Sequence, residues 1–401
     1  MKTVYLDSFF GLLNKFFYYG LRVLIIFLFS EKATTTDFAT FIYVLNIVEI
    51  ARLLLDFGID STYTRNLARM SDEEAKECVE IIISQKLLLS IFSSGVMVTV
   101  FYFSGITNVS LLVSTAFILP LISANSFVNI FFQSKNNNRI LSGYYITAFL
   151  LSGLMIYMFS SKLEYYFIYA LMEIVFFMIL TYAVYRKTNF KLKFITFTEM
   201  RKTYQTSLYN GSSQTVVTIY SKTDLLFIQK LSSAINVAYY GFFMRIMDPL
   251  LMVASALATS AYSFFSKEID SKDKPTIKRN LRQYLLVTFI YACFILAVIT
   301  FLLPFLLEVI KSKYKISSSI AFFFGLATAI RIISAAQGSI LLSMGKFNYT
   351  FKIALINICS LFPFYFVLIP MFNIRGVLLS IVASELICVV IKLRTLKPIL
   401  F

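Results

Sequence analysis

Apolar runs of membrane-spanning length recur along the whole chain, and they constrain its fold more than any other feature. A helix of roughly 20 apolar residues crosses the hydrocarbon core of a bilayer, and only helices or closed barrels satisfy their backbone in lipid. These runs are too long and continuous for barrel strands. We therefore predict an all-α integral membrane protein with about twelve transmembrane helices, at approximately 9–30, 37–59, 80–104, 109–132, 141–160, 163–185, 207–229, 235–265, 283–307, 317–343, 349–370 and 375–394.

Composition supports this class and excludes several others. Hydrophobic residues make up 58% of the chain and charged residues 14%, against about 45–50% and about 25% in soluble domains. The sequence has no histidine, which excludes histidine-based catalytic triads, metal sites and proton relays. The four cysteines show no paired spacing, so we expect small buried apolar residues without a disulfide framework. No catalytic residue, metal site or cofactor is predicted.

The Lys and Arg residues of the predicted loops define an orientation. Most of them fall in alternate loops, and such basic loops face the cytoplasm. Both termini are therefore predicted to be cytoplasmic, and the net charge of +16 reflects topology, with no nucleic acid as partner. A basic connection at 186–206 is predicted to lie as a cytoplasmic linker on the lipid headgroups. It separates an N-terminal six-helix lobe (1–185) from a C-terminal six-helix lobe (207–401).

The two halves carry related sequence blocks in the same order. Aligned pairs are 34–50 with 233–249, 122–138 with 333–349, and 169–174 with 382–386. Each half holds an even number of predicted spans, so both enter the membrane in the same direction. The blocks therefore predict a parallel repeat with a pseudo-twofold axis along the membrane normal. Transporters place their substrate in a cavity between such halves.

Cations within the apolar spans are the strongest functional signal. A charge facing lipid is costly, and six cations in five spans would be prohibitive there. We expect them to line a shared water-filled cavity with more cations than anions. Such a cavity suits a phosphate or pyrophosphate, which arginine can bind through two hydrogen bonds. The predicted binding residues are Lys15, Arg22, Arg52, Lys222, Arg245 and Arg331.

Other charges in the spans have simpler explanations. Glu49, Arg52 and Asp56 share one helical stripe and could instead form an intrahelical bridge that neutralises itself. Three more charges are assigned structural roles. Glu173 and Glu385 are expected to form hydrogen bonds, and Lys86 is expected to snorkel to a membrane surface.

Several segments resemble one family of membrane transporters. They are the R-x-L at Arg22 to Leu24, DFATFIY (37–43), LLDFGID (54–60) with the following RNLAR (65–69), SKTDLLFIQKLSSAINVAYYGFFMRI (221–246), GKFNYTFKIALIN (345–357) and NIRGVLLSIVASEL (373–386). Together they resemble the bacterial polysaccharide repeat-unit flippases, which serve O-antigen, capsule and exopolysaccharide synthesis. These belong to the multidrug/oligosaccharidyl-lipid/polysaccharide (MOP) exporter superfamily. The resemblance extends over essentially the whole chain.

The resemblance implies a fold and an activity. The fold would be two six-helix lobes in a V around a central cavity that opens inward and then outward. The cargo would be a polyprenyl-pyrophosphate-linked oligosaccharide, moved across the bacterial cytoplasmic membrane without enzymatic chemistry. Implied partners are the bilayer and the polysaccharide polymerase with its chain-length machinery. Side chains expected to meet sugar are Tyr18, Asn46, Tyr220 and Tyr262.

The resemblance also implies coupling to an H⁺ or Na⁺ gradient. The candidate carboxylates for that ion are Asp56, Asp224, Asp248 and Glu49.

Three alternatives stay open. A cationic-drug antiporter of the same fold needs an acid-rich cavity, whereas the residues expected here are mostly Lys and Arg. A membrane polysaccharide polymerase or ligase typically needs a large outside loop, and the predicted outside loops are short. A lipid II flippase of the same superfamily would be favoured by fourteen spans.

Overall fold

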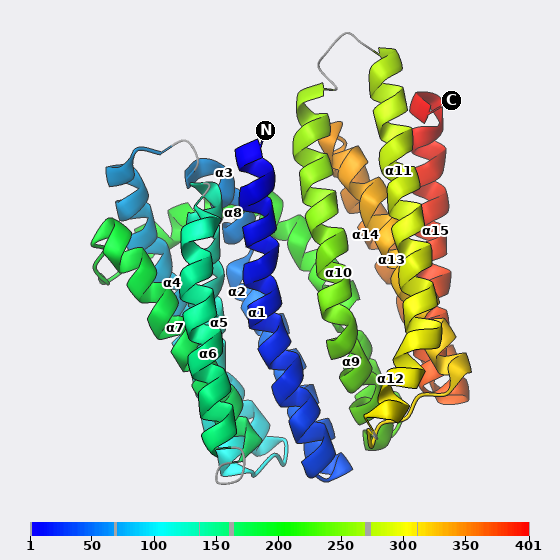
Figure 1. Ribbon diagram of the computed structural model, residues 1–401, viewed down its shortest axis with the longest axis horizontal. Coiled ribbons are helices and arrows are strands. Elements are labelled where there is room, and N and C mark those ends of the chain that lie inside the picture. The colour runs from blue at the N-terminus through cyan, green and yellow to red at the C-terminus, as the bar shows by residue number, and fades with distance from the viewer. Residues whose placement is uncertain are drawn as a thin grey trace. The chain divides into compact units, whose positions relative to one another are not determined.

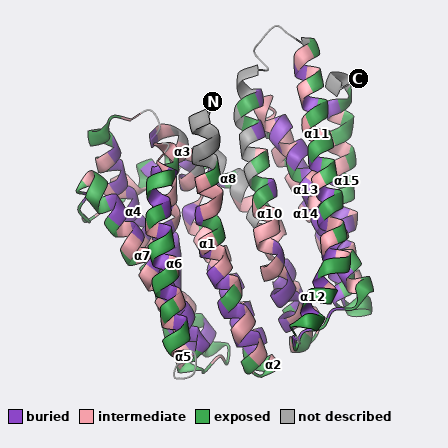
Figure 2. Cartoon of the chain, in the orientation of Figure 1, coloured by how far each residue is buried: buried purple, intermediate pink, exposed green. Residues whose placement is uncertain are grey.

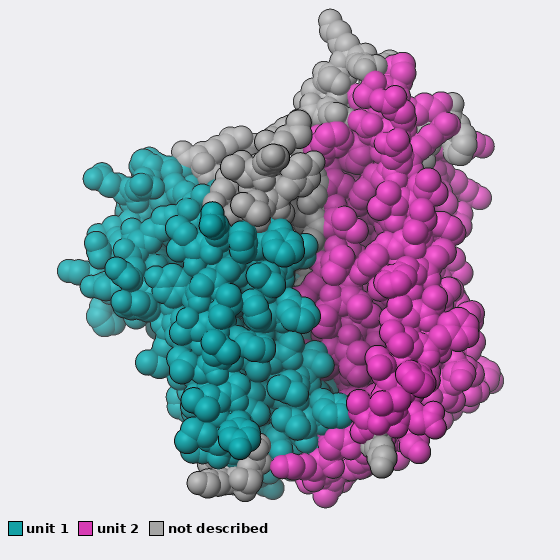
Figure 3. All heavy atoms as spheres, in the orientation of Figure 1, with its two compact units in different colours: residues 1–29, 41–218 teal, residues 30–40, 219–401 magenta. Residues whose placement is uncertain are grey.

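The computed structural model describes residues 2–67, 70–135, 137–159, 164–268, 274–310 and 312–400. Those residues form helices and connections, with no strand among them (Figure 1). Ala68 and Arg69, at the end of the RNLAR segment, lie outside this set. The chain divides into two compact units (Figure 3), one formed by 1–29 with 41–218 and the other by 30–40 with 219–401.

Unit 1 is built around one central helix. Its elements are α1 (Lys2–Lys32) and α2 (Thr35–Asp56) except for their joined tips, α3 (Ile59–Leu67), α4 (Asp72–Phe103), α5 (Val109–Ser134), α6 (Asn138–Phe159), α7 (Tyr165–Thr188) and most of α8 (Phe197–Lys222). Helix α5 packs against α4 and α7, and α6 packs against α7 (Figure 1). Most of α5 is buried.

Unit 2 repeats this packing order. Its elements are α9 (Asp224–Leu231), α10 (Ala234–Glu268), α11 (Lys274–Ala297), the π-helical η1 (Val298–Leu302), α12 (Leu303–Val309), α13 (Ser318–Ser343), α14 (Phe347–Phe372) and α15 (Ile374–Leu400). Helix α13 packs against α11 and α15, and α14 packs against α15. Helices α13, α14 and α15 thus take the parts of α5, α6 and α7, as the aligned sequence blocks predict.

Local sequence explains where several helices begin. Ser71 starts α4 with a capping box, in which its backbone N–H donates to Glu74 Oε2 (2.8 Å) and the N–H of Glu74 donates to Ser71 Oγ (3.4 Å). Asn108 caps α5 by accepting from the N–H of Leu111 (3.0 Å). These side chains satisfy backbone donors that the first turn leaves open.

Eleven helices among the described residues are long and apolar enough to cross a membrane. The predicted span at 207–229 has no counterpart among them. It falls on α8, whose first half is polar, and on α9, which starts a new helix after a break at Thr223. Large apolar side chains such as Phe92, Phe103 and Phe301 are highly exposed, as expected of surfaces that face lipid. The chain is a multi-pass membrane protein.

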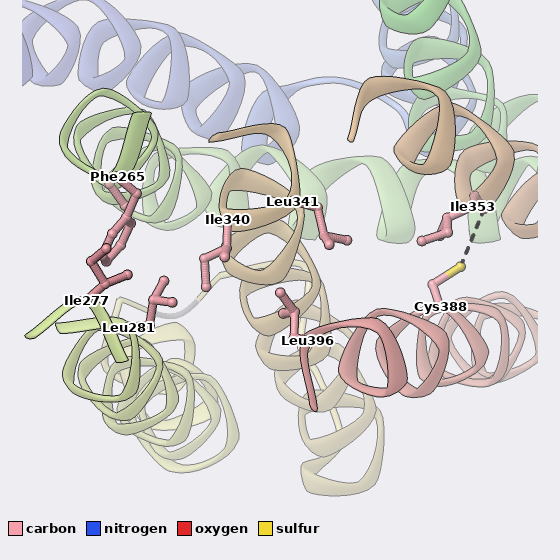
Figure 4. Packing of buried hydrophobic residues seen from close by; sticks show 9 residues of the cluster. Phe265, Ile277, Leu281, Ile340, Leu341, Ile353, Cys388 and Leu396 are labelled. Atoms are coloured by element: carbon pink, nitrogen blue, oxygen red, sulfur yellow. Dashed lines mark hydrogen bonds between the residues drawn. The ribbon is translucent and has the colours of Figure 1, made fainter. Parts of the chain in front are cut away.

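The core of unit 2 packs side chains from five helices (Figure 4). The cluster is formed by Ala261, Phe265, Ile277, Leu281, Ile340, Leu341, Ile353, Cys388 and Leu396. Inside a membrane such close contacts act through van der Waals packing, because lipid is as apolar as the side chains. Figure 2 shows that buried residues recur along α13.

The cysteines are free, as predicted. The prediction that all four are buried was wrong for two of them. Cys78 and Cys388 are buried, whereas Cys293 on α11 and Cys359 on α14 are exposed.

The tip that joins α1 to α2 belongs to unit 2. Glu31 accepts hydrogen bonds from Ser312 Oγ (2.8 Å) and from the backbone N–H of Lys313 (2.9 Å). The ring of Phe38 packs against Tyr314, with centroids 5.4 Å apart. Both contacts attach the tip to the connection between α12 and α13, while the rest of α1 and α2 belongs to unit 1.

Candidate functional site

A buried ion pair joins the first and last membrane helices of unit 1. Arg22 on α1 lies 2.6 Å from Glu173 on α7, and its Nε donates to the same carboxylate at 2.8 Å. Tyr18, one turn before Arg22, donates to the second carboxylate oxygen at 2.8 Å. Glu173 is fully buried. Its predicted role in structural hydrogen bonding is confirmed.

Aromatic rings surround this pair. The guanidinium carbon of Arg22 lies 4.2 Å from the ring centroid of Tyr18 and 5.7 Å from that of Tyr169. Cations are attracted to the faces of such rings, more strongly where water is excluded. The ring of Tyr19 lies 5.5 Å away, so Arg22 is held by an acid, the hydroxyl of Tyr18 and three rings. The hydroxyl of Tyr18, expected to meet sugar, is directed to Glu173 instead.

A second buried cluster gathers around Lys86 on α4. Its ammonium lies 2.6 Å from Asp56 Oδ1, 2.5 Å from Asp60 Oδ1 and 3.1 Å from the hydroxyl of Ser126 on α5. The side chain of Lys86 is 3% exposed. The prediction that Lys86 snorkels was wrong, because two carboxylates make burial of its charge favourable. Asp56 therefore pairs with Lys86 of α4, and its contacts are not limited to the charges on its own face of α2.

The cluster is positioned by a sharp bend after α2. Phe57 and Gly58 adopt positive φ values of 39° and 73°, and α3 begins at the next residue. Glycine adopts this conformation readily, whereas a bulky residue there costs roughly 1–2 kcal/mol. The bend turns Asp60 back toward Asp56, whose Oδ1 accepts from the backbone N–H of Asp60 at 3.3 Å.

Unit 2 holds a comparable buried acid. Asp224, at the start of α9, accepts a hydrogen bond from Tyr240 of α10 at 2.5 Å. Arg331 of α13 lies 4.0 Å from the same carboxylate oxygen, which is beyond direct hydrogen-bond distance. The side chain of Arg331 is 15% exposed. This guanidinium is therefore close to an acid but less tightly held than Arg22.

Further charges of unit 2 have local partners. Arg245 and Asp248 form a pair one turn apart on α10, at 3.7 Å. Glu385 accepts from Asn357 at 3.2 Å, which confirms its predicted hydrogen bonding.

The structure divides the predicted binding residues between the units. Lys15, Arg22 and Arg52 belong to unit 1, and Lys222, Arg245 and Arg331 belong to unit 2. Lys15 is exposed, Arg22 is buried, and the other four are half-buried. Acid partners lie within 4.0 Å of Arg22, Arg245 and Arg331. Among the four candidate carboxylates Asp56 and Asp224 are buried, whereas Glu49 and Asp248 are half-buried.

Sequence reasoning missed three residues of these clusters. Asp60 follows Asp56 by four positions across the bend at Phe57 and Gly58, and this spacing of two acids can be read from the sequence. Tyr240 carries no local signal for its bond to Asp224. Lys392 falls near the end of the predicted span at 375–394, and its ammonium donates to the carbonyl and hydroxyl oxygens of Ser334 at 3.0 and 2.7 Å. Lys392 is therefore a second half-buried cation beside α13.

The fold defines the class of protein. It matches the multidrug transporter DinF-BH with a TM-score of 0.72 at 16% identity, covering 100% of this chain and 96% of that chain. It matches the lipid II flippase MurJ, in an inward closed conformation, with a TM-score of 0.67 at 16% identity, covering 96% of this chain and 86% of that chain. It also matches a MOP superfamily transporter from Pyrococcus furiosus, with a TM-score of 0.67 at 13% identity, covering 99% of this chain and 95% of that chain. The fold is that of MOP superfamily transporters.

Sequence comparison then gives the family. The family model described as polysaccharide biosynthesis protein matches residues 7–269, so the chain belongs to that family. The MatE model matches residues 212–371. A comparison with curated proteins finds no match. The resemblance stated from the sequence is confirmed at the level of the family and of the fold, which is shared with MOP superfamily transporters.

Proposed function

We propose that this protein is a flippase that moves polyprenyl-pyrophosphate-linked oligosaccharide repeat units across the bacterial cytoplasmic membrane. The observation that carries the proposal is the polysaccharide biosynthesis family match over residues 7–269, on a fold that is also similar to a lipid II flippase. The transported units would supply O-antigen, capsule or exopolysaccharide. The polymerase and chain-length machinery would receive them on the outer side, and both termini would be cytoplasmic.

The cations of the membrane helices suit the pyrophosphate. Arginine binds such a group through two parallel hydrogen bonds. Arg331 is the best-placed candidate, because its acid partner lies at 4.0 Å and leaves donors of its guanidinium available. Arg22 contributes less directly, since Glu173 and Tyr18 take its donors. Lys15, Arg52, Lys222 and Arg245 complete the proposed set.

An ion gradient would drive the exchange between inward-open and outward-open states. A ligand shifts such an equilibrium only by binding the two states with different affinity. Buried carboxylates that change partners between states can provide this difference for H⁺ or Na⁺. Asp56 and Asp224 fit best because both are buried, and Asp248 and Glu49 remain further candidates. No bond of the cargo is made or broken, so the protein would not be an enzyme.

Reconstitution tests the proposal directly. The purified protein is placed in liposomes that carry a polyprenyl-pyrophosphate oligosaccharide with a fluorescent sugar. A membrane-impermeant reductant then quenches the label in the outer leaflet. We expect the quenched fraction to rise well above the roughly one half accessible in protein-free liposomes. Transport of the label no faster than in protein-free liposomes, under both H⁺ and Na⁺ gradients, would overturn the proposal.

A second candidate is a multidrug antiporter. It is favoured by the MatE match at 212–371 and by the likeness to DinF-BH. The same liposomes can be loaded with a cationic rhodamine dye. Dye export driven by an ion gradient, together with no movement of the labelled lipid, would favour this candidate over the flippase.

A further inference from the structure

The bend between α2 and α3 is held from two sides. Its backbone carries Phe57 and Gly58 at positive φ, a conformation that a phenylalanine keeps only when its surroundings impose it. The contacts that impose it come from α4 on one side and from α8 on the other. These two sets of contacts therefore depend on one another through the bend.

On the first side, Lys86 pulls the two helices together. Asp56 ends α2 and Asp60 lies in the first turn of α3, so the two carboxylates stand on either side of the bend. Both lie within 2.6 Å of the one ammonium. Two negative charges share one positive charge, and the cluster carries an excess negative charge. It can therefore accept one proton without leaving Lys86 unpaired.

On the second side, α8 rests on the backbone of the bend. Tyr204 donates to the carbonyl oxygen of Leu55 at 2.7 Å. A Cβ added to Gly211 would lie 2.4 Å from the carbonyl oxygen of Phe57, so only glycine permits this approach. Tyr204, Ser207 and Gly211 lie on one face of α8, and Ser207 is fully buried. We call this contact, formed by those three residues, the α8 seat.

Helix α8 continues past the seat into the other unit. Residues 197–218 belong to unit 1, and the last turn of the same helix belongs to unit 2. The next helix begins with Asp224, the buried acid that binds Tyr240. A displacement of α8 at its seat would therefore be transmitted along this helix to its last residue, Lys222, two positions before Asp224.

The charges around the bend allow it to respond to pH. Burial raises the pKa of Asp60 to about 6; the charge of Asp56 adds to this rise and that of Lys86 opposes it. The other ionisable groups that act on the cluster are Arg52 of α2 and Tyr204 of α8.

We propose that the α2–α3 bend is a proton-operated seat for α8. When both aspartates are ionised, Lys86 holds α3 against α4, the bend is closed and α8 is docked. When the pair takes up a proton, α3 loses its ion pair to Lys86, Phe57 relaxes and α8 leaves its seat. The ammonium of Lys86 fills the place between the carboxylates that Na⁺ would take, so the ligand is H⁺. The link to transport rests on the proposed function, but the movement of α8 does not.

Thiol labelling of the full chain in lipid nanodiscs, without any oligosaccharide, tests this. Exposed Cys293 and Cys359 are first replaced by serine. Ser207→Cys then places a thiol at the seat, and Leu208→Cys places one at the neighbouring position, whose side chain is 60% exposed. The ratio of the two labelling rates removes the pH dependence of the reagent. We expect this ratio to rise roughly tenfold from pH 8 to pH 5, with a midpoint near 6.

Two further variants decide the cause. In Asp60→Asn the ratio should be high and independent of pH, whereas Glu77→Gln, an exposed acid on α4, should keep the rise. When Gly211→Ala is combined with Ser207→Cys, the thiol at the seat should react at every pH, because the added methyl group displaces α8. Equal protection of the Ser207→Cys thiol at pH 5 and pH 8, or the same rise in Asp60→Asn, would overturn the proposal. Because no cargo is present, either result leaves the flippase proposal to its own assay.

Discussion

The guanidinium of Arg22 and the carboxylate of Glu173 lie 2.6 Å apart between α1 and α7, with the carboxylate fully buried. Removing one partner of such a pair leaves a charge without compensation, which costs about 3–5 kcal/mol. We expect Glu173→Leu to lose about this much stability. The measurement is the fraction of purified protein that survives heating as a monodisperse species in size-exclusion chromatography.

The double variant Arg22→Met with Glu173→Leu is the matched control. Two apolar residues of similar volume leave no buried charge, and such replacements are often neutral. We expect the double variant to recover most of the lost thermal stability. A double variant as unstable as Glu173→Leu would show that the pair's contacts, rather than the uncompensated charge, determine the loss.

Gly211→Ala tests the close approach of α8 to the bend. The added methyl group would overlap the carbonyl oxygen of Phe57, so the helix must shift or the protein must lose stability. Gly143→Ala on α6 is the control, because a Cβ there meets nothing within 4 Å. Alanine should make that helix more stable, by up to about 1 kcal/mol. Equal heat resistance of the two variants would contradict the packing at Gly211.

The pH dependence of stability should differ in sign between two acids. Burial raises the pKa of Asp60 to about 6 in the folded protein, whereas a free aspartate has about 3.9. The folded state therefore binds this proton more tightly than the unfolded chain. As pH falls from about 7 to about 4, the parent should gain on the order of 1–2 kcal/mol relative to Asp60→Asn. Thermal unfolding at several pH values measures the difference.

Glu199 provides the opposite case. The backbone and hydroxyl of Thr196 donate to its carboxylate and lower its pKa. Its stabilising contribution is present above the pKa of the unfolded chain and is lost as pH falls through the lower pKa of the folded state. The parent should therefore lose stability relative to Glu199→Gln on acidification. A parallel response of the two variants would count against the assigned pKa directions.

Arg331 is the sharpest test of the proposed pyrophosphate site. Arg331→Ala should lower the rate of lipid-linked oligosaccharide transport at least about tenfold, since one charge-assisted contact is worth roughly 1.5–3 kcal/mol. Arg331→Lys keeps the charge but not the planar fork, and should retain partial activity. Arg139→Lys, an exposed cation on α6, serves as control in the same liposomes. Normal transport by both Arg331 variants would assign that side chain a purely structural role.

The helices could be predicted from the sequence because apolar length is a local property. Eleven of the predicted spans correspond to apolar helices, and the polar first half of α8 explains the exception. The pairing of buried charges could not be predicted in the same way. The sequence predicts that Glu173 hydrogen bonds, but its partner Arg22 lies 151 positions away. The prediction for Lys86 was wrong because only the fold reveals that two aspartates meet it.

The tip at 30–40 and the first part of α8 determine what happens when the polypeptide is cut into two fragments. A cut in the connection near residue 191 would give one fragment whose tip is part of unit 2. The other fragment would carry residues 197–218, which are part of unit 1. Each fragment would then complete the partner's fold, as in a reciprocal exchange of elements between protomers. Two separately expressed pieces should assemble into one transporter, and neither should be stable alone.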